Sequence, residues 1–553
     1  MKKTLLIYIC IFFCLKTAAQ NVHLTAEGAT KTETTTIDSI GYTKVHPNAK
    51  SLKTETERLA TQLYAAGFFE SQISANIKLN DSTYLFQYKL GSRIANIKVA
   101  TKLLSKSEKD LLNITEDTIN LSPAGIENFM AGKLTLLEQK GYPLSQLQLT
   151  NYTRKNNTLT TTLQLTLEKK RSVDNLVIEG YPKFPESIRR NILKQYKKKP
   201  FNKHNIQKIY QTFNNLRFVS LPRYPEILFK QDTTTIYVYA QKANANTFDG
   251  FIGFSNDEQQ KLKLNGYLDL TLINTLNNGE KFNLYWKNNG QKQSTFNTSL
   301  ELPYIFKSPI GIKGDLQIFR QDSTFQNTVS NINLAYYFKY NTKILIGRSA
   351  TTSVSTAQTN TSLSGYNSKF WTATYETAAY DNRYTFFPER YTLYIRYGNG
   401  KRDSEKGNSN QYFAQAIADY NAPLNNKNLI YTKTQLYYLN SQNFVVNELQ
   451  RFGGINSIRG FNENILQGDM YSFLMTEYRY IASENLCLHS IFDVGYYQDH
   501  ATNQNNGLFS IGFGAKIFTS NGIFNIIYAN GTEKSQNVKL SNSIVHISFK
   551  TKF

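Results

Sequence analysis

The chain has 553 residues and a formal net charge of +22 at pH 7, more basic than a neutral cytosolic enzyme usually is. Its length exceeds that of one ordinary domain, so we expect at least two domains. Hydrophobic residues make up 40% of the chain and aromatic residues 13%, a composition that favours strands. Beyond the N-terminal segment no apolar run of about 18 residues occurs, so any membrane role must use strands.

Residues 1–19 have the pattern of a secretory signal peptide. Lys2 and Lys3 precede an apolar run from Leu5 to Leu15, and small residues follow as far as Ala19. The run of about 11 residues is shorter than the roughly 20 that a membrane-spanning helix needs. We therefore expect cleavage after Ala19. The next stretch, 20–39, is rich in threonine without helical periodicity, and we interpret it as a linker.

The sequence offers little chemistry for catalysis. Cleavage of the signal peptide leaves Cys487 alone, which excludes an internal disulfide and a zinc–thiolate site. No G-x-S-x-G, H-E-x-x-H or G-x-x-x-x-G-K-[ST] motif occurs, and the six histidines are scattered. We expect no catalytic residues, no metal and no cofactor, and the chain is not predicted to be an enzyme.

Three segments between about residues 40 and 243 share one pattern. In each, a helix-like segment is followed by a short aromatic turn and then by an alternating strand. The turns begin at Gly67, Gly141 and Leu216, at spacings of 74 and 75 residues. A constant spacing indicates an array of small domains, each with two helices on a small sheet. The predicted units span 40–92, 93–171 and 172–243. They resemble the POTRA domains of outer-membrane assembly proteins, although an unrelated α+β repeat would show a similar pattern.

A basic run, RRNILKQYKKKPFNKH from Arg189 to His204, lies on the first helices of the third unit. One interpretation is a solvated helix face. The other is contact with anionic lipid head groups, because this unit would be nearest to a membrane.

From residue 247 to 553 the dominant pattern is alternation with a period of two. Candidate strands begin near 248 and recur to 541, and they number sixteen. The region allots about 19 residues to each strand, enough for a strand of about 10 residues with its turn or loop. A soluble β-sandwich also alternates, but it rarely extends over some 300 residues without splitting into domains. The sequence therefore predicts a transmembrane antiparallel β-barrel of 16 strands.

The last predicted strand, SIVHISFKTKF, alternates clearly. Its apolar face consists of Val545, Ile547, Phe549 and Phe553. Its polar face consists of His546, Ser548, Lys550 and Lys552. Outer-membrane barrels commonly end on an aromatic residue, as this chain does.

A glycine-rich loop, RFGGINSIRGFNENI, lies between the eleventh and twelfth candidate strands. Its SIRGF segment matches the [VI]RG[FY] motif of the BamA and TamA family and of two-partner secretion transporters. Further matches follow in chain order: TEYRY, FDVG, SIGFGAKI, NIIYANG and the terminal strand. The chain thus resembles the BamA/TamA family of the surface-antigen superfamily over nearly its whole mature length, and its layout is most similar to that of TamA.

The resemblance implies that the loop folds into the barrel lumen. There the Arg459 guanidinium would bind the carboxylates of Glu477 and Asp493 through paired, charge-assisted hydrogen bonds. Asp493 alternates with apolar neighbours and is expected to face inward, whereas Glu477 could instead pair locally with Arg479. An exposed arginine without contacts is the alternative. The predicted loop motif consists of Gly454, Ile458, Arg459, Gly460 and Phe461.

The function implied by the resemblance is assembly of outer-membrane proteins. The POTRA units, in the periplasm, would receive unfolded client polypeptides, which would enter the lipid at the barrel seam between 248–256 and 543–553. The expected partners are unfolded outer-membrane or secreted client proteins, outer-membrane lipid and a periplasm-spanning protein, but not nucleic acid. The alternative is a two-partner secretion transporter, which passes an extended substrate through the lumen and usually has two POTRA units and a plug helix.

Overall fold

The computed structural model describes residues 21–256, 262–288, 293–321, 324–355, 363–381, 386–405, 407–534 and 539–553. The predicted signal peptide, residues 1–19, lies outside these ranges. The chain forms two compact units, one comprising residues up to 172 with 200–204, the other 173–199 with 205–553. In the described ranges, no helix is both long and apolar enough to cross a membrane.

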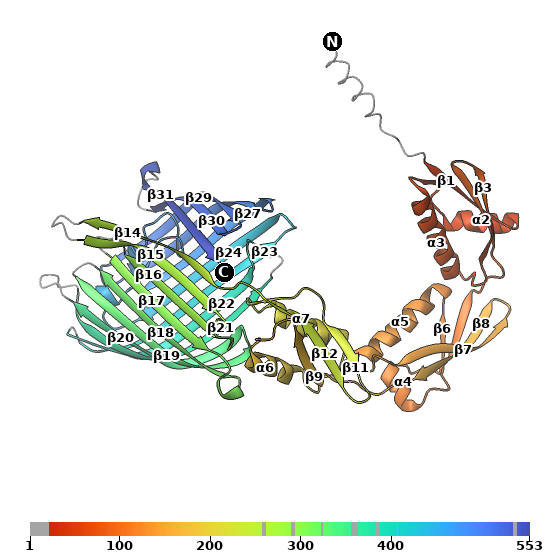
Figure 1. Cartoon of the computed structure of the whole chain (residues 1–553), viewed down its shortest axis with the longest axis horizontal. Coiled ribbons are helices and arrows are strands. Elements are labelled where there is room, and N and C mark those ends of the chain that lie inside the picture. Colours follow the sequence, from red (N-terminus) through yellow and green to blue (C-terminus); the bar gives the residue numbers. More distant parts are fainter. Residues whose placement is uncertain are drawn as a thin grey trace, which may run out of the picture. The chain divides into compact units, whose positions relative to one another are not determined.

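The first α+β unit begins earlier than the sequence predicts. Its sheet has the strand order β2-β1-β4-β3, with β1 parallel to β4 and helices on one side (Figure 1). Its elements are β1 (Val22–Gly28), α2 (Lys31–Ile40), β2 (Val45–His46), α3 (Ala49–Ala65), β3 (Gln72–Asn80) and β4 (Thr83–Lys89).

The predicted linker at 20–39 is therefore wrong. Thr30 caps α2 by accepting a hydrogen bond from the Glu33 amide at 3.2 Å, and Ile37 is fully buried in the core of this unit. Five threonines and serines give this helix a low intrinsic propensity and no clear apolar stripe. Burial of Ile37 and pairing of β1 with β4, which lies about sixty residues away in sequence, determine the local structure instead.

The second unit repeats the same topology. Its sheet order is β6-β5-β8-β7, with β5 parallel to β8. Its elements are β5 (Asn96–Ala100), α4 (Lys106–Leu112), β6 (Thr118–Leu121), α5 (Pro123–Gln139), β7 (Gln146–Lys155) and β8 (Thr158–Thr166). Ser105 and Glu108 form a capping box at the start of α4.

The aromatic turns of these two units are helix C-terminal caps. Gly67 and Gly141 follow α3 and α5 with φ of 97° and 94°, a left-handed conformation that glycine adopts without strain. The next amides, of Phe68 and Tyr142, donate to carbonyls five residues back, Leu63 and Leu137, at 3.0 and 2.8 Å. This is the Schellman arrangement, in which the residue after the glycine packs back on the helix. The repeat at 74 residues therefore has a physical basis.

The third unit, apart from residues 200–204, belongs to the same compact unit as the barrel. Its main sheet has the order β11-β12-β9, with β9 parallel to β12. Its elements are β9 (Asn175–Glu179), α6 (Glu186–Tyr196), α7 (Lys203–Asn214), β10 (Val219–Ser220), β11 (Glu226–Phe229), β12 (Thr234–Tyr239) and β13 (Gln241–Lys242).

The remainder is a closed antiparallel barrel whose sixteen described strands follow one another in chain order (Figure 1). This confirms the predicted fold class. The strands are β14 (Thr247–Asn256), β15 (Leu262–Ile273), β16 (Lys281–Asn288), β17 (Gln293–Leu302), β18 (Ile310–Gln321), β19 (Phe325–Lys339), β20 (Thr342–Ser355), β21 (Tyr366–Tyr380), β22 (Glu389–Ser404), β23 (Ser409–Pro423), β24 (Asn428–Asn440), β27 (Met470–Ser483), β28 (Leu486–Asp499), β29 (Gln504–Thr519), β30 (Gly522–Glu533) and β31 (Ser543–Lys552).

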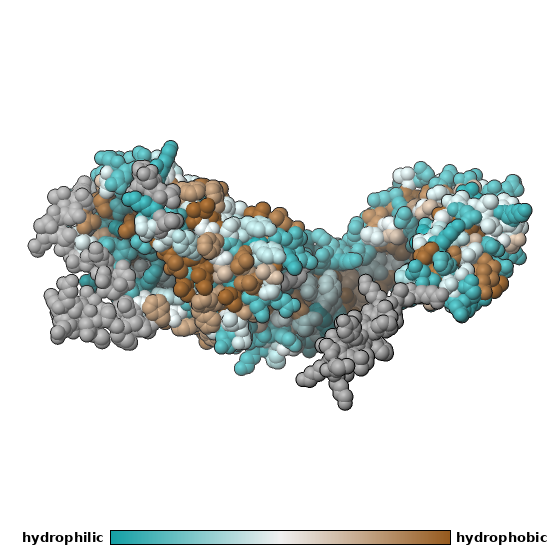
Figure 2. Space-filling model, turned by 90° about the horizontal axis from the view of Figure 1, so that it is seen from above, coloured by the Kyte–Doolittle hydropathy of each residue, from teal (hydrophilic) through white to brown (hydrophobic). Residues whose placement is uncertain are grey.

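The outer face of the barrel is apolar. On β19, Ile332 and Leu334 are 71% and 55% exposed, whereas the intervening Asn331 and Asn333 are buried. Figure 2 shows hydrophobic residues gathered on the visible face of the barrel. The terminal strand has the same alternation: Val545, Ile547 and Phe549 are exposed, and His546 and Ser548 between them are less so. A continuous apolar exterior with a polar interior is the reverse of a soluble protein.

We expect Gly67→Ala to destabilise the first unit by about 1–3 kcal/mol, because φ there is left-handed and an added Cβ would lie 2.0 Å from the Ile94 carbonyl oxygen. Gly132→Ala, in the middle of α5 with open space around it, is the matched control and should stabilise by about 0.5–1 kcal/mol. Urea unfolding of the full-length protein, followed by helical circular dichroism, measures both. Equal midpoints for the two variants would refute the role of the cap.

Candidate functional site: a loop held inside the barrel

The segment between β24 and β27 folds into the barrel. It contains a short helical turn, η2 (Val446–Glu448), and a two-stranded hairpin of β25 (Gln450–Phe452) and β26 (Leu466–Gly468). We call residues 453–465 the loop tip. The structure thus places the glycine-rich motif between the eleventh and twelfth barrel strands, where the sequence places it.

Arg459 joins the loop tip to two neighbouring barrel strands. Its Nε donates to Asp493 Oδ2 at 2.8 Å and its backbone N–H donates to the same oxygen at 3.2 Å. Its two terminal nitrogens donate to Asp493 Oδ1 and Glu477 Oε1. Arg459 is 4% exposed, and both acids are buried. The structure therefore brings the three predicted residues together, Glu477 on β27 and Asp493 on β28.

Glu477 serves two arginines. Its second oxygen, Oε2, accepts a hydrogen bond from Arg479 Nε at 2.7 Å, so the local pair and the loop pair coexist. The Arg479 guanidinium lies between two aromatic rings, with its central carbon 3.9 Å from the ring centres of both Phe387 and Tyr431. Two buried cations and two buried carboxylates thus neutralise one another. Burial of any one of these charges would be costly without the others.

The glycine of the RGF motif allows backbone contact with the barrel wall. Gly460 has φ of 79°, and a Cβ added there would lie 2.3 Å from the backbone nitrogen of Gly531 on β30. Conversely, a Cβ on Gly531 would lie 2.6 Å from the Gly460 carbonyl oxygen. Two motifs 71 residues apart, SIRGF and NIIYANG, therefore meet glycine to glycine. Gly454 also has a positive φ, of 97°, in the turn that opens the loop tip.

Apolar packing fixes the loop tip as well. Ile458, fully buried, lies in a cluster on the inner wall, and Phe461 packs against the same cluster. The rings of Tyr471 and Phe473 in this cluster stack with their centres 4.6 Å apart. The other members are Phe452, Met475, Tyr497 and Leu508.

Other contacts of the loop tip were not predicted. Glu463 bonds to Lys287 Nζ and accepts from the Tyr285 hydroxyl at 3.1 Å, both on β16. The Asn456 carbonyl accepts from Lys433 and Gln435, each at 3.0 Å. The loop tip is thus held by several separate strands. Lys287 lies 176 residues from Glu463, and no sequence signal links them.

The stem of the loop has its own buried ion pair, which the sequence reading also missed. Arg402 on β22 is fully buried and donates from Nη1 to Glu448 Oε1 at 2.5 Å. Glu448 Oε2 accepts from Gln411 at 3.0 Å. Neighbouring Asn447 donates to Ser353 and to the Ser364 carbonyl, at 2.7 and 2.8 Å. These bonds hold the stem against the part of the wall that precedes β24, from β20 to β23.

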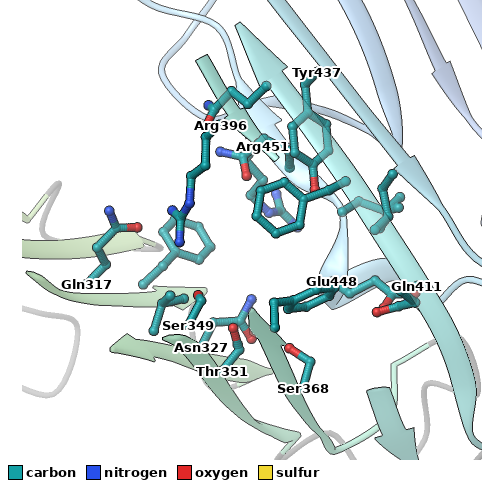
Figure 3. Close-up of a pocket in the computed structure, with 18 of the residues that line it drawn as sticks. Gln317, Asn327, Ser349, Thr351, Ser368, Arg396, Gln411, Tyr437, Glu448 and Arg451 are labelled. Carbon is teal, nitrogen blue, oxygen red and sulfur yellow. The ribbon is translucent and has the colours of Figure 1, made fainter. Parts of the chain in front are cut away.

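Beside the stem lies a cavity of about 520 Å³ (Figure 3). Amide and hydroxyl side chains line it, among them Gln317, Ser349 and Gln411, together with the guanidinium groups of Arg396 and Arg451. The Arg396 group lies 5.4 Å from the Phe413 ring centre. A lining so rich in polar groups is suited to water.

The seam between the first and last strands is short. Only two residue pairs join β14 to β31, Thr247 with Lys552 and Phe248 with Thr551, supported by a bond from Phe553 N–H to the Asn246 carbonyl at 3.1 Å. By contrast, β14 pairs with β15 over ten positions and β30 with β31 over nine.

A second cavity, of about 820 Å³, reaches this seam. Its lining includes the lumenal residues Arg459, Glu463 and Glu477, and also outward-facing Val545 and Ile547, which are 57% and 61% exposed. Because side chains of both faces line one cavity, it connects the lumen with the outer surface where the first and last strands are unpaired.

No family model and no curated protein matches the sequence. The fold is similar to that of CdiB from Escherichia coli, with a TM-score of 0.52, 13% identity and coverage of 91% of this chain and 98% of that one. CdiB from Acinetobacter baumannii has a TM-score of 0.49 and 12% identity, with coverage of 91% of this chain and 97% of that one. BamA from Haemophilus ducreyi lacking POTRA domains 1–3 has a TM-score of 0.46 and 15% identity, with coverage of 84% of this chain and 100% of that one. Similarity at such identities describes the fold alone.

Fold and site together define the class: α+β units joined to a 16-stranded antiparallel barrel with an arginine-anchored loop in its lumen. Among the described residues, no group of three or more His, Cys, Asp or Glu side chains is arranged to hold a metal ion. The candidate site therefore consists of a loop bonded to the inner wall and a short seam between the first and last strands.

We expect Arg459→Ala to release the loop tip, because two buried carboxylates lose their partner at a cost of about 3–5 kcal/mol. Hydrogen exchange at residues 453–465 should accelerate, while the barrel still inserts and keeps its heat-modifiable migration. Arg459→Lys should restore little, since an ammonium cannot bond both acids in the same geometry. Arg459→Ala combined with Asp493→Asn should cost less than the sum of the single changes, and simple additivity would contradict the pairing.

We expect Gly531→Ala to displace the loop tip as well, although alanine suits the backbone there, because its Cβ would lie 2.6 Å from the Gly460 carbonyl oxygen. Gly507→Ala on the adjacent β29 is the matched control, since its Cβ would meet no atom closer than 3.5 Å. Protease cleavage within 453–465 should increase in the first variant only. Similar cleavage in both would show that the glycine contact does not hold the loop.

Proposed function

We propose that this protein is an outer-membrane assembly factor. It receives client polypeptides on periplasmic POTRA units and inserts them into the lipid at the barrel seam. Three α+β units before a 16-stranded barrel form the layout that the resemblance to TamA implies. The observation that carries the proposal is the seam, with two residue pairs where the neighbouring ladders have nine and ten.

A short seam suits strand addition. Backbone N–H and C=O groups left unpaired in lipid are costly, so unpaired strand edges at the seam would bind an incoming client strand. The cavity that reaches the seam gives a client access from the lumen to this edge. Folding of the client supplies the free energy, and no nucleotide or cofactor takes part.

The α+β units offer edges for the same kind of pairing. In the first unit, β3 is an edge strand of its sheet and carries exposed apolar side chains, with Ile73, Ile77 and Leu79 45%, 41% and 55% exposed. An extended client could add to such an edge through backbone hydrogen bonds, with its apolar side chains resting on the exposed ones.

A two-partner secretion transporter is the alternative, and the similarity of fold to CdiB is compatible with it. Such a transporter passes its substrate through the lumen. Here Arg459, Glu463 and Glu448 tie the loop to separate parts of the wall, and threading a chain would require breaking these bonds. Nor is α2 a free plug helix, because its Ile37 is buried in the first unit. These contacts favour insertion at the seam.

Comparison of the outer-membrane proteome with and without the protein tests the proposal. Loss of several unrelated barrel proteins is the expected result. Loss of a single secreted protein, with the barrels unaffected, would favour the transporter instead.

A disulfide across the seam should block the proposed function. Thr247→Cys with Lys552→Cys joins a directly paired position, in a Cys487→Ser background. We expect barrel assembly to fall about tenfold or more under oxidising conditions and to recover with reductant, because the seam can no longer open. The matched control, Ile312→Cys with Leu334→Cys, crosslinks strands already paired over twelve positions and should have no effect. Normal assembly with a fully locked seam would exclude insertion there.

A further inference from the structure

The basic run of the third unit lies at the rim of the barrel. Helix α6 packs against three consecutive turns that connect barrel strands. Ile188 lies against Gly279, between β15 and β16, where an added Cβ would approach its Cδ1 to 2.6 Å. The helix also contacts η1 (Ile305–Lys307), between β17 and β18. Gln195 Nε2 donates to the Phe338 carbonyl at 2.9 Å, near the turn between β19 and β20.

This rim is where the apolar exterior of the barrel begins. Phe338 and Tyr336, on β19, are 49% and 50% exposed, and their rings meet edge to face with centres 5.3 Å apart. Beside η1, the outward-facing Leu302, Ile310 and Ile312 are also exposed. Aromatic side chains of this kind commonly mark the interface between lipid and water. Through Gln195, α6 is therefore bonded to a residue of the apolar belt.

Phe306 in η1 stands out from this surface. It is 93% exposed, and its φ of 53° is a left-handed value that is unusual for a bulky residue. Tyr304, two residues earlier, and Lys307, directly after it, have φ of 55° and 59°. A strained turn that holds a phenylalanine away from the protein is expected at a site of binding. Exposure to water alone would be unfavourable for this ring, whereas contact with acyl chains would not.

The charge next to Phe306 is strongly positive. Residues 186–199 contain six cations and one carboxylate. The carboxylate, Glu186, is already bonded to Arg189 and Arg190, each at 2.7 Å. Arg190 and Lys194 are one helical turn apart on the same exposed face of α6, and exposed Lys197 follows at its end. Together with Lys307, these residues form a basic ridge beside the apolar rim.

We propose that the α6 ridge and the η1 turn form a membrane-anchoring surface, in which Phe306 enters the acyl chains while Arg190, Lys194 and Lys197 bind the phosphates of anionic phospholipids. An aromatic side chain at the depth of the acyl chains, next to cations at the depth of the phosphates, is the arrangement that fits a lipid interface. This anchoring surface would fix the third unit against the bilayer, next to the strand-connecting turns that α6 contacts. The inference rests on the proposed placement of the barrel in a membrane.

Spin labels on the full-length protein in nanodiscs test the position of η1. In the Cys487→Ser background, a nitroxide at Phe306→Cys should be accessible to oxygen and shielded from a water-soluble nickel relaxant. Ile332→Cys, on the barrel exterior and 71% exposed, is the lipid reference. Asp81→Cys, whose parent side chain is 92% exposed in the first unit, is the water reference. If the Ile332 label lies in lipid and the Phe306 label in water, the anchor is refuted while the membrane barrel stands. If both lie in water, the membrane placement itself fails.

Lipid retention tests the basic ridge. The triple variant Arg190→Gln, Lys194→Gln and Lys197→Gln, purified from nanodiscs of phosphatidylcholine with phosphatidylglycerol, should retain at least about fivefold less phosphatidylglycerol. The matched control, Lys31→Gln with Lys50→Gln and Lys53→Gln, makes the same change of charge on exposed positions of the first unit and should retain as much as the parent chain. Unchanged retention in the ridge variant would mean that the run is a solvated face. An equal loss in both variants would show a nonspecific effect of net charge and would also overturn the proposal.

Discussion

The bonds from Arg459 to Asp493 and Glu477 are the interaction on which the inside of this barrel depends. A guanidinium in the middle of a loop would be costly to bury alone, and so would two carboxylates on neighbouring strands. Each makes burial of the others possible, and Arg479 balances the remaining charge through Glu477. The bidentate geometry also fixes the direction from which the loop enters, because the backbone N–H of Arg459 shares an oxygen of Asp493 with its side chain. A lysine would supply the charge without this geometry.

Around this pair the loop is fitted to the wall by shape. Gly460 and Gly531 bring two backbones together, and Ile458 enters an aromatic cluster on the inner wall. Glu463 and Glu448 then attach the tip and the stem to other strands. The loop therefore acts as an internal brace across the lumen of the barrel. The contrast with the seam is clear, since the brace has several charged and apolar contacts where the seam has two residue pairs. The contacts are numerous around the loop and fewest between β14 and β31, as the proposed insertion at the seam would require.

The barrel strands and the repeated α+β units could be predicted from the sequence because both are local patterns. The period of two identified the strands and the outward face of the last one, where Val545 and Ile547 alternate with smaller exposures. The turns at Gly67 and Gly141 marked the ends of two helices, and the order of motifs along the chain placed Arg459 near its acids through family resemblance. The threonine-rich segment at 20–39 has no such local pattern, because its helix depends on burial of Ile37 in a core that distant residues complete. The sequence leaves open which face of its strand Glu477 occupies, because its neighbours at two-residue spacing include apolar Phe473 and Met475 as well as charged Arg479.

The amino-acid sequence by itself determined the period of the strands, their number and the residues able to carry a buried charge. Only the tertiary structure decided which charges meet. Closure of sixteen strands brings β16 and β22 to the same lumen as a loop that follows β24, so Lys287 reaches Glu463 across 176 residues and Arg402 reaches Glu448 across 46. Such pairs depend on barrel curvature and register, which are properties of the whole closed sheet and are absent from any short stretch of chain.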